Sequence, residues 1–273
     1  MSVLVIADLH LDMWLGAQRD PLAAISADVW ASLDALIIAG DLCNKPKVRW
    51  TPLINHLGRY IAPERIYLFP GNHDYYDFRL DGDDRLTEIC TSAGAHFSQK
   101  SEFVVGDTRF LSCTLWTDFA LYGDPARAMR IAEAGMNDFR YIRLAGAGHR
   151  RIRPSDITFV HTDHRRWLEE RLAMSFGGRT VVISHHCPHP DLISATPDLI
   201  NSAYGSDLCP VIEAYQPDAW LFGHTHKNLE GMVGQTLVRN VSLGYPGEVR
   251  QGEEAAILLR GLFETGASSG ETK

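Results

Sequence analysis

The sequence predicts an α/β sandwich, and two observations support this prediction. Short apolar runs bounded by Gly or Pro, which are typical of buried strands, alternate with segments whose apolar residues recur at roughly helical spacing. Five of these runs are followed at once by side chains that can bind metal ions. Because the carboxyl ends of parallel strands meet at one edge of a sheet, we expect these side chains to converge there.

The first half of the chain alternates regularly between the two kinds of segment. The apolar run at residues 3–7 predicts the first strand, and the spacing of apolar residues at 21–33 predicts the first helix. The next expected elements, in chain order, are a strand at 35–39, a helix at 51–62, a strand at 66–69, a helix at 81–93 and a hairpin of 103–105 with 110–114 around Gly106-Asp107. This alternation favours the α/β class.

The regular pattern loosens between about residues 116 and 160. We interpret this stretch, with an expected helix at 126–134, as an insertion packed over the active-site edge. Beyond it the expected helices are 162–174 and 206–214, and the expected strands are 180–183, 219–222, 236–240 and 255–259. One domain is expected over residues 1–265, followed by a Gly/Ser-rich disordered tail at 266–273.

Composition narrows the class of protein. With 45% hydrophobic and 22% charged residues among 273, the chain resembles a globular protein with a sizeable core. A net charge of −8 argues against a protein that coats nucleic acid or an anionic membrane. Five widely spaced cysteines without a C-x-x-C pair fit reduced thiols, and no signal peptide or membrane span is apparent. We therefore expect a cytoplasmic protein.

The polar motifs behind the five apolar runs supply carboxylate, imidazole and amide groups. Their candidate ligands are Asp8 and His10, Asp41, Asn72, His185, and His224 with His226. Residues two apart on an extended segment point the same way, so each of the two i, i+2 pairs can grip one cation. Such a mixed set of ligands suits Mn²⁺, Fe or Zn²⁺ better than Ca²⁺ or Mg²⁺.

The number of candidate ligands favours two metal ions over one. Six or seven donors exceed what a tetrahedral site takes, and the carboxylate of Asp41 can bridge two ions. Two metals roughly 3.5–4 Å apart activate a bridging water and clamp the oxygens of an in-line phosphoryl displacement. We expect two divalent ions, with Mn²⁺ as the first choice and Fe or Zn²⁺ as alternatives.

The ordered set of motifs D-x-H, G-D, G-N-H-[D/E], H and G-H-x-H resembles that of the calcineurin-like metallophosphoesterase superfamily. The match runs from Asp8 to His226, about four-fifths of the chain, with every ligand present. The resemblance implies a two-sheet β-sandwich flanked by helices. It further implies a first metal on Asp8, His10, Asp41 and His226, and a second metal on Asp41, Asn72, His185 and His224. His73 would be the general acid for the leaving oxygen or a clamp on the phosphate.

Departures from the superfamily pattern narrow the range of expected substrates. In the protein Ser/Thr phosphatases the second motif continues as GDxxDRG, whereas Asn44 and Lys45 stand here in place of the carboxylate and the arginine. The third motif is closer to bacterial phosphodiesterase-like branches, and segments 115–119 and 136–139 are similar to bacterial predicted phosphohydrolases. We expect a dinuclear phosphodiesterase acting on a small phosphoester such as a nucleotide ester. The alternatives are a phosphomonoesterase, a small nuclease and a metal-bound scaffold without activity.

Several residues near the motifs keep two interpretations. Tyr75 and Tyr76 either stack on a base or aryl group, or pack the insertion against the sandwich. Asp12 and Asp118 either orient ligand imidazoles or serve in turns. The basic stretch 149–153 either clamps a substrate phosphate or forms a solvated face.

Overall fold

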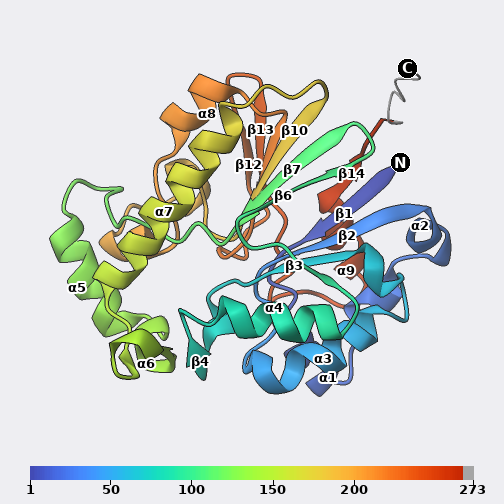
Figure 1. Ribbon diagram of the computed structural model, residues 1–273, viewed down its shortest axis with the longest axis horizontal. Coiled ribbons are helices and arrows are strands. Elements are labelled where there is room, and N and C mark those ends of the chain that lie inside the picture. Colours follow the sequence, from blue (N-terminus) through green and yellow to red (C-terminus); the bar gives the residue numbers. More distant parts are fainter. Residues whose placement is uncertain (267–273) are drawn as a thin grey trace.

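Two large sheets pack face to face in the computed structural model, which describes residues 1–266 (Figure 1). The first sheet consists, in spatial order, of β14 (Leu262–Glu264), β1 (Ser2–Ile6), β2 (Leu33–Ala39), β3 (Ile66–Phe69) and β5 (His96–Phe97). The second consists of β12 (Glu230–Val233), β13 (Thr236–Asn240), β11 (Ala219–Phe222), β10 (Arg179–Ser184), β7 (Thr108–Cys113) and β6 (Ser101–Val105). The two-sheet sandwich is therefore confirmed.

The central strands of both sheets run parallel, and antiparallel strands lie only at the edges. In the first sheet β1 pairs in parallel with β2, and β2 with β3; in the second, β10 pairs in parallel with both β7 and β11. The two sheets are joined beyond the end of β1, where Ala7 forms a parallel bridge with Ser242, two residues after β13. The carboxyl ends of strands from both sheets consequently meet along one edge.

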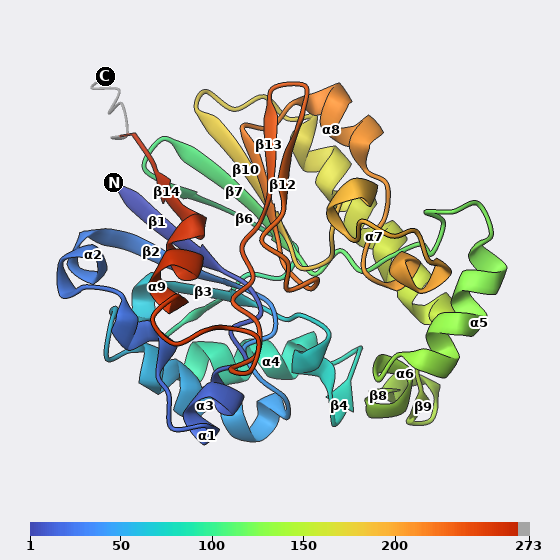
Figure 2. The same ribbon diagram turned by 180° about the vertical axis from the view of Figure 1, so that it is seen from behind.

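The core has three apolar layers. Inner faces of the two sheets meet through residues such as Val5, Ile37 and Ile183. The outer face of the first sheet is covered by α1 (Leu11–Gly16), α2 (Ala27–Ser32), α3 (Pro46–Leu57), α4 (Asp83–Ser92) and α9 (Glu254–Leu258). The outer face of the second is covered by α7 (Pro154–Leu172) and α8 (Cys209–Tyr215), as Figure 2 shows from behind.

A third, small sheet lies beside the main sandwich. It pairs β4 (Phe78–Arg79) with β8 (Ile142–Leu144), and β8 with β9 (Arg150–Arg151), next to α5 (Pro125–Gly135) and α6 (Asp138–Tyr141) (Figure 2). All these elements except β4 belong to the segment 116–160. The segment is anchored by α5, which packs against the 3-10 helix η6 (Leu199–Ala203) through its buried face at Ala128 and Ala132.

The structure corrects two of the expected elements. Residues 255–259 do not form a strand; they lie in α9 and the following turn η7 (Leu259–Gly261), because a short apolar run fits a buried helix as well as a strand. The helix expected at 21–33 is interrupted. A 3-10 turn, η1 (Pro21–Ala24), precedes α2, because the Ser26 side chain accepts a hydrogen bond from the Val29 amide and starts a new helix.

Other boundaries differ by a few residues from those expected. The helix expected at 162–174 already begins at Pro154, the first residue of α7, and the helix expected at 51–62 begins at Pro46. Of the tail 266–273, only Gly266 is among the described residues, where its amide donates to Asp107 Oδ1. None of the helices within residues 1–266 combines the length and hydropathy that a membrane span requires.

Candidate metal centre

The structure brings all seven predicted ligands together at the carboxyl edge of the two sheets. Asp8 and His10 follow β1, Asp41 follows β2, Asn72 follows β3, His185 follows β10, and His224 with His226 follow β11. Six of these side chains are at most 8% exposed, and the seventh, His226, is 15% exposed. Residues that lie far apart in the sequence thus form one buried cluster.

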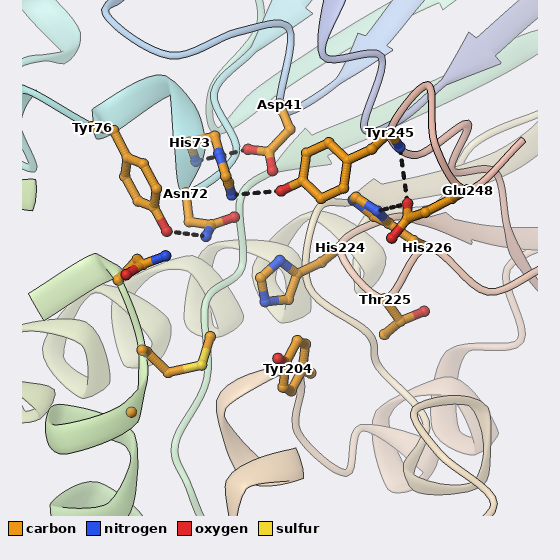
Figure 3. A pocket seen from close by; sticks show the side chains of 13 residues that line it. Asp41, Asn72, His73, Tyr76, Tyr204, His224, Thr225, His226, Tyr245 and Glu248 are labelled. Atoms are coloured by element: carbon orange, nitrogen blue, oxygen red, sulfur yellow. Dashed lines mark hydrogen bonds and ion pairs between the residues drawn. The ribbon is translucent and has the colours of Figure 1, made fainter. Parts of the chain in front are cut away.

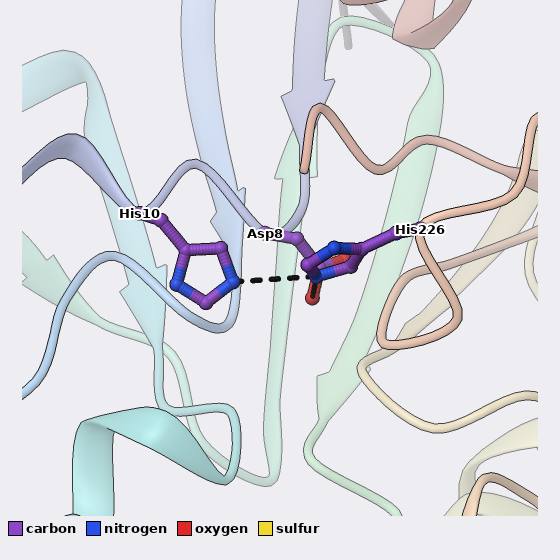
Figure 4. Close-up of side chains that lie close together, drawn as sticks. All are labelled: Asp8, His10 and His226. Carbon is purple, nitrogen blue, oxygen red and sulfur yellow. Dashed lines mark hydrogen bonds and ion pairs between the residues drawn. The ribbon is translucent and has the colours of Figure 1, made fainter. Parts of the chain in front are cut away.

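A first group consists of Asp8, His10 and His226, whose nitrogen and oxygen atoms face one another (Figure 4). His226 Nε2 lies 3.3 Å from Asp8 Oδ1 and 3.3 Å from His10 Nε2. Buried Asp8 Oδ1 has no hydrogen-bond partner among the described residues, while Oδ2 accepts from Ser242 Oγ and the His224 amide. One carboxylate oxygen is therefore held in place and the other is left for a cation.

A second group consists of Asp41, His185 and His224. His185 Nε2 lies 3.5 Å from Asp41 Oδ2 and 3.1 Å from Asn72 Oδ1. Asp41 Oδ2 is also 3.8 Å from His10 Nε2, so this oxygen lies between the two groups. The arrangement agrees with the shared position that the resemblance implies for Asp41.

Hydrogen bonds on the far side of the ligands aim their free atoms into the cluster. His185 Nδ1 donates to the Ala39 carbonyl, so in the neutral imidazole Nε2 is the nitrogen without a proton and the one that can bind a metal. The Asn72 amide donates from Nδ2 to Asp138 Oδ1, so its Oδ1 faces inward. Buried His224 Nε2 has no partner among the described residues. The donor set and its unpaired atoms fit divalent metal ions.

The backbone at these positions is strained. Asp8, His10, Asp41, His224 and His226 all have positive φ, between 39° and 68°. Non-glycine residues rarely adopt such angles, and their clustering is typical of sites whose geometry is fixed before the ligand binds.

Glycines of the motifs permit the close packing of these loops. A Cβ at Gly71 would collide with the Asp41 carboxylate, and a Cβ at Gly223 would collide with Ala7 and Asp8 Oδ2. These two glycines are therefore required by the close approach of a neighbouring ligand loop.

The charges of the cluster balance one another. Burial alone would raise the pKa of Asp8, but the imidazoles of His226 and His185 hold it below its usual value. Burial alone would lower the pKa of His185, yet the carboxylates of Asp41 and Asp8 raise it to about 9. The pKa of His226 is likewise raised to about 9, against burial, by Asp8 and Glu248. In contrast, burial lowers the pKa of His10 to about 3.

Metal uptake should therefore release protons. In the metal-free protein His185 and His226 are charged near neutral pH, and an imidazole must lose its proton to bind a metal. Between about pH 7 and pH 9 we expect up to two protons released per chain and an affinity that rises with pH, both effects fading above about pH 9. Calorimetric titration with Mn²⁺ in buffers of different ionisation enthalpy measures this release. Identical heats in all buffers at neutral pH would contradict the assigned charges.

His73 lies at the rim of the cluster and is half-buried (Figure 3). Its backbone amide donates to Asp41 Oδ1, and its Nδ1 donates to Asn44 Oδ1 at 2.8 Å. Its Nε2 faces the Tyr245 hydroxyl at 3.3 Å. Because an amide oxygen only accepts, Asn44 fixes the tautomer with the proton on Nδ1 in the neutral imidazole.

Four further residues that sequence reasoning missed hold the cluster in place. Glu248 Oε2 accepts from His226 Nδ1 at 2.8 Å, and Ser242 binds Asp8 as described above. Asp138 accepts from both Asn72 and the Tyr76 hydroxyl. Asp74, the last residue of the G-N-H-D motif, is buried and accepts the amides of Gly71 and Asp41–Cys43. Asp74 carried a sequence signal through its place in that motif, and Asp138 lies in the segment 136–139 that is similar to bacterial predicted phosphohydrolases.

For Asp12 and Asp118 the structure favours the interpretation that does not involve the ligand imidazoles. Asp12 pairs with Arg49, and Asp118 accepts from Ser206 Oγ, so neither bonds a ligand imidazole. His186, which follows the ligand His185, is also buried, and its ring centroid lies 4.2 Å from that of His224.

Tyr75 and Tyr76 have different surroundings in the structure. Tyr75 is buried and donates to Asp83 Oδ1, a packing role. The ring of Tyr76 stacks on His73 with centroids 4.3 Å apart and also lines the pocket.

A pocket of about 350 Å³ opens over the cluster (Figure 3). One wall is Gly135–Asn137 of the segment 116–160, and three tyrosines, Tyr76, Tyr204 and Tyr245, face the opening. Among the described residues that line it there is no Lys or Arg. The only lining acidic side chain apart from Asp41 is Glu248.

A two-sheet sandwich with carboxylates and imidazoles gathered at its carboxyl edge is the architecture of a protein that can bind divalent metal ions there. Residues 1–228 match the sequence profile of the calcineurin-like phosphoesterase family, so the chain belongs to that family. The protein is thus a metal-dependent phosphoester hydrolase, and membership implies divalent metal ions at the site described above.

Known proteins support the fold. The chain is 25% identical over 233 residues to uncharacterized protein L509 of Acanthamoeba polyphaga mimivirus, with 78% of this chain and 79% of that protein covered. A phosphopantetheinyl hydrolase from Mycobacterium tuberculosis superposes with a TM-score of 0.68 at 19% identity, with 90% of both chains covered. A putative 5'-nucleotidase from Staphylococcus aureus gives a TM-score of 0.52 at 17% identity, with 88% of this chain and 48% of the other covered.

Proposed function

We propose that the protein is a dinuclear phosphodiesterase that acts on a small phosphoester. Two groups of facing donors support two ions: Asp8, His10 and His226 in one group, and His185 with His224 in the other. Asp41 Oδ2 lies within 4 Å of imidazoles from both groups, at the position a bridging ligand needs. The mixture of imidazole, carboxylate and amide favours Mn²⁺, with Fe or Zn²⁺ as alternatives.

The charge of the pocket supports a diester over a monoester. A monoester is close to doubly charged near neutral pH, because its second pKa is about 6, whereas a diester carries a single charge. No cationic Lys or Arg is among the described residues that line the pocket, and Glu248 adds a negative charge. Beyond the proposed metal ions, the described lining of the pocket therefore offers no Lys or Arg side chain that would balance the second negative charge of a monoester. This observation carries the diester assignment.

Each group in the site has a distinct role in the proposed reaction. Bound metal ions would supply an activated water and neutralise charge on the phosphate oxygens. Asp8, Asp41, Asn72 and the four histidines would hold those ions. His73, with Nδ1 fixed by Asn44, directs Nε2 into the pocket. In its protonated form it delivers the Nε2 proton to the departing oxygen.

Positions around His73 support its proton-transfer role. Its ring is clamped between the stacked Tyr76 ring and the Tyr245 hydroxyl, which limits its rotation. The segment 116–160, which we propose is an insertion, supplies Asp138 to orient Asn72 and Asn137 to the pocket wall.

Turnover of two model esters tests the proposed function. Metal-stripped enzyme is titrated with Mn²⁺ while hydrolysis of bis(p-nitrophenyl) phosphate and p-nitrophenyl phosphate is followed. We expect diester turnover to rise until about two metals are bound per chain and to exceed monoester turnover. Preference for the monoester would contradict the diester assignment, and saturation at one metal would contradict the dinuclear site. Nucleotide and phosphopantetheinyl diesters then form the first natural-substrate screen.

A further inference from the structure

Three arginines lie side by side across the small sheet. Arg79 of β4 is the register partner of Arg143 of β8, and Arg143 is the register partner of Arg151 of β9. Directly opposed residues share one face of a sheet, and the neighbouring residues Phe78 and Ile142 are buried on the other face. Like charges in such positions repel one another, so the row lowers stability unless an anion lies over it.

A cavity of about 360 Å³ is formed at this row. Its lining includes Arg79, Arg143, His149, and two cations from other elements, Lys47 of α3 and Arg85 of α4. These four lysine and arginine side chains gather at one place on a chain whose net charge is −8. The lining of this cavity is therefore positively charged, although the protein as a whole is negatively charged.

Few carboxylates offset these charges. Arg79 pairs with Asp84 and Arg85 pairs with Glu88, but the acidic partners are 72% and 65% exposed, so the pairs are weak. Lys47 and Arg143 have no carboxylate within ion-pair distance among residues 1–266. Asp77 lines the same cavity, but its Oδ2 forms an ion pair with Lys45 Nζ at 3.6 Å. Two cations remain available to an anion.

A third hollow, next to His73, lies between the cationic cavity and the active site. Its lining includes Tyr76, Tyr141, Tyr245 and Asp77. It shares His73 with the pocket over the metal cluster and Asp77 with the cationic cavity. This tyrosine-lined hollow, called the aromatic passage below, therefore adjoins both the metal cluster and the cationic cavity.

We propose that the cavity at Arg143 and Lys47 is a subsite for a second, remote phosphate carried by the leaving group of the substrate. This inference rests on the proposed function and adds to it the substrate class: a phosphodiester whose leaving group also bears a phosphate. Arginine binds phosphate through paired hydrogen bonds, and lysine contributes a point charge. The tyrosines of the passage contact the organic group between the two phosphates.

A small substrate fits the observations better than a nucleic acid strand. The cationic residues gather around one surface hollow of about 360 Å³, and the chain as a whole has a net charge of −8. A strand would instead need a continuous positive track that neutralises several successive phosphates.

Calorimetric binding of bisphosphates to the metal-loaded enzyme tests the proposal. Alkyl monophosphates are compared with α,ω-alkanediol bisphosphates of increasing chain length, so that a flexible linker can span the passage. At one chain length we expect the bisphosphate to bind at least about tenfold more tightly than the monophosphate. Two equivalent ends alone give about a twofold statistical advantage. An advantage no greater than twofold at every length would overturn the proposal.

Variants at two separate elements locate the second phosphate. Arg143→Ala and Lys47→Ala should each remove most of the bisphosphate advantage and leave monophosphate affinity and turnover of bis(p-nitrophenyl) phosphate unchanged. Arg166→Ala, which removes the same charge from a 68% exposed side chain of α7, is the matched control. Persistence of the advantage in both variants would overturn the proposal, as would tighter binding of an oligothymidylate than of any bisphosphate.

The proposed function and the inference can fail separately. Wild-type enzyme that shows the bisphosphate advantage but does not hydrolyse bis(p-nitrophenyl) phosphate would contradict the diester assignment and retain the phosphate subsite. Wild-type enzyme that hydrolyses this diester without any bisphosphate advantage would support the diester assignment and contradict the phosphate subsite.

Discussion

Replacement of Asp41 by asparagine is expected to abolish the metal centre and the activity together. Asp41 Oδ2 faces His10 and His185 from the two ligand groups, so each of the two proposed ions would lose a charged ligand. Even removal of a partner outside the ligand set typically lowers metal affinity or activity 10–100-fold, so we expect a loss of at least about a hundredfold in metal affinity. The folded backbone should persist, because an amide oxygen can still accept from the His73 amide.

Metal content by mass spectrometry and diester turnover measure this effect. Asp28→Asn, which removes the same charge from an exposed position in α2, is the control and should retain both properties. An Asp41→Asn protein that still carries two metals per chain would show that Asp41 does not bridge them.

His73→Ala should produce the second large effect, a loss of kcat with unchanged metal content. General acid catalysis typically contributes about 10²–10⁴-fold, and the loss should be greatest for esters with poor leaving groups, which need the proton most. An activated ester such as bis(p-nitrophenyl) phosphate should be the least affected substrate.

A series of diesters with increasingly basic leaving groups measures the role of His73. The slope of log kcat against leaving-group pKa should become steeper in the variant, while His96→Ala, at an exposed histidine of β5, should leave the slope unchanged. Equal losses of kcat across the series would contradict the role of His73 as a general acid and would favour its role as a clamp on the phosphate.

The ligand cluster was predictable because its residues stand in a fixed relation to strands. Each follows an apolar run, and parallel strands bring their carboxyl ends to one edge. Glu248 and Ser242 lie in loops after β13, where neither periodicity nor a motif marks a polar residue. Asp138 orients Asn72 from the loosely patterned segment 116–160. Such contacts depend on tertiary packing between segments, which a single sequence does not encode locally.

Errors in the elements have a similar origin. The run at 255–259 is apolar on every side and short, so its period does not distinguish helix from strand, and packing on the first sheet decides for α9. The missed strands β12 and β14 lie at sheet edges. Their exposed residues, such as Met232 and Leu262, give no buried apolar run.

The bond between Asp8 and Ser242 spans 234 positions of the chain, and its consequence concerns biosynthesis. During translation strands β1, β2, β3 and β5 of the first sheet can pair long before residues 224–242 emerge, but neither of the proposed ions can then find its full set of ligands. Contacts of such separation also form late in folding, because a long loop must close first. Metal capture therefore marks completed chains: a product truncated ahead of His224 would contain much of the sandwich and no hydrolytic centre.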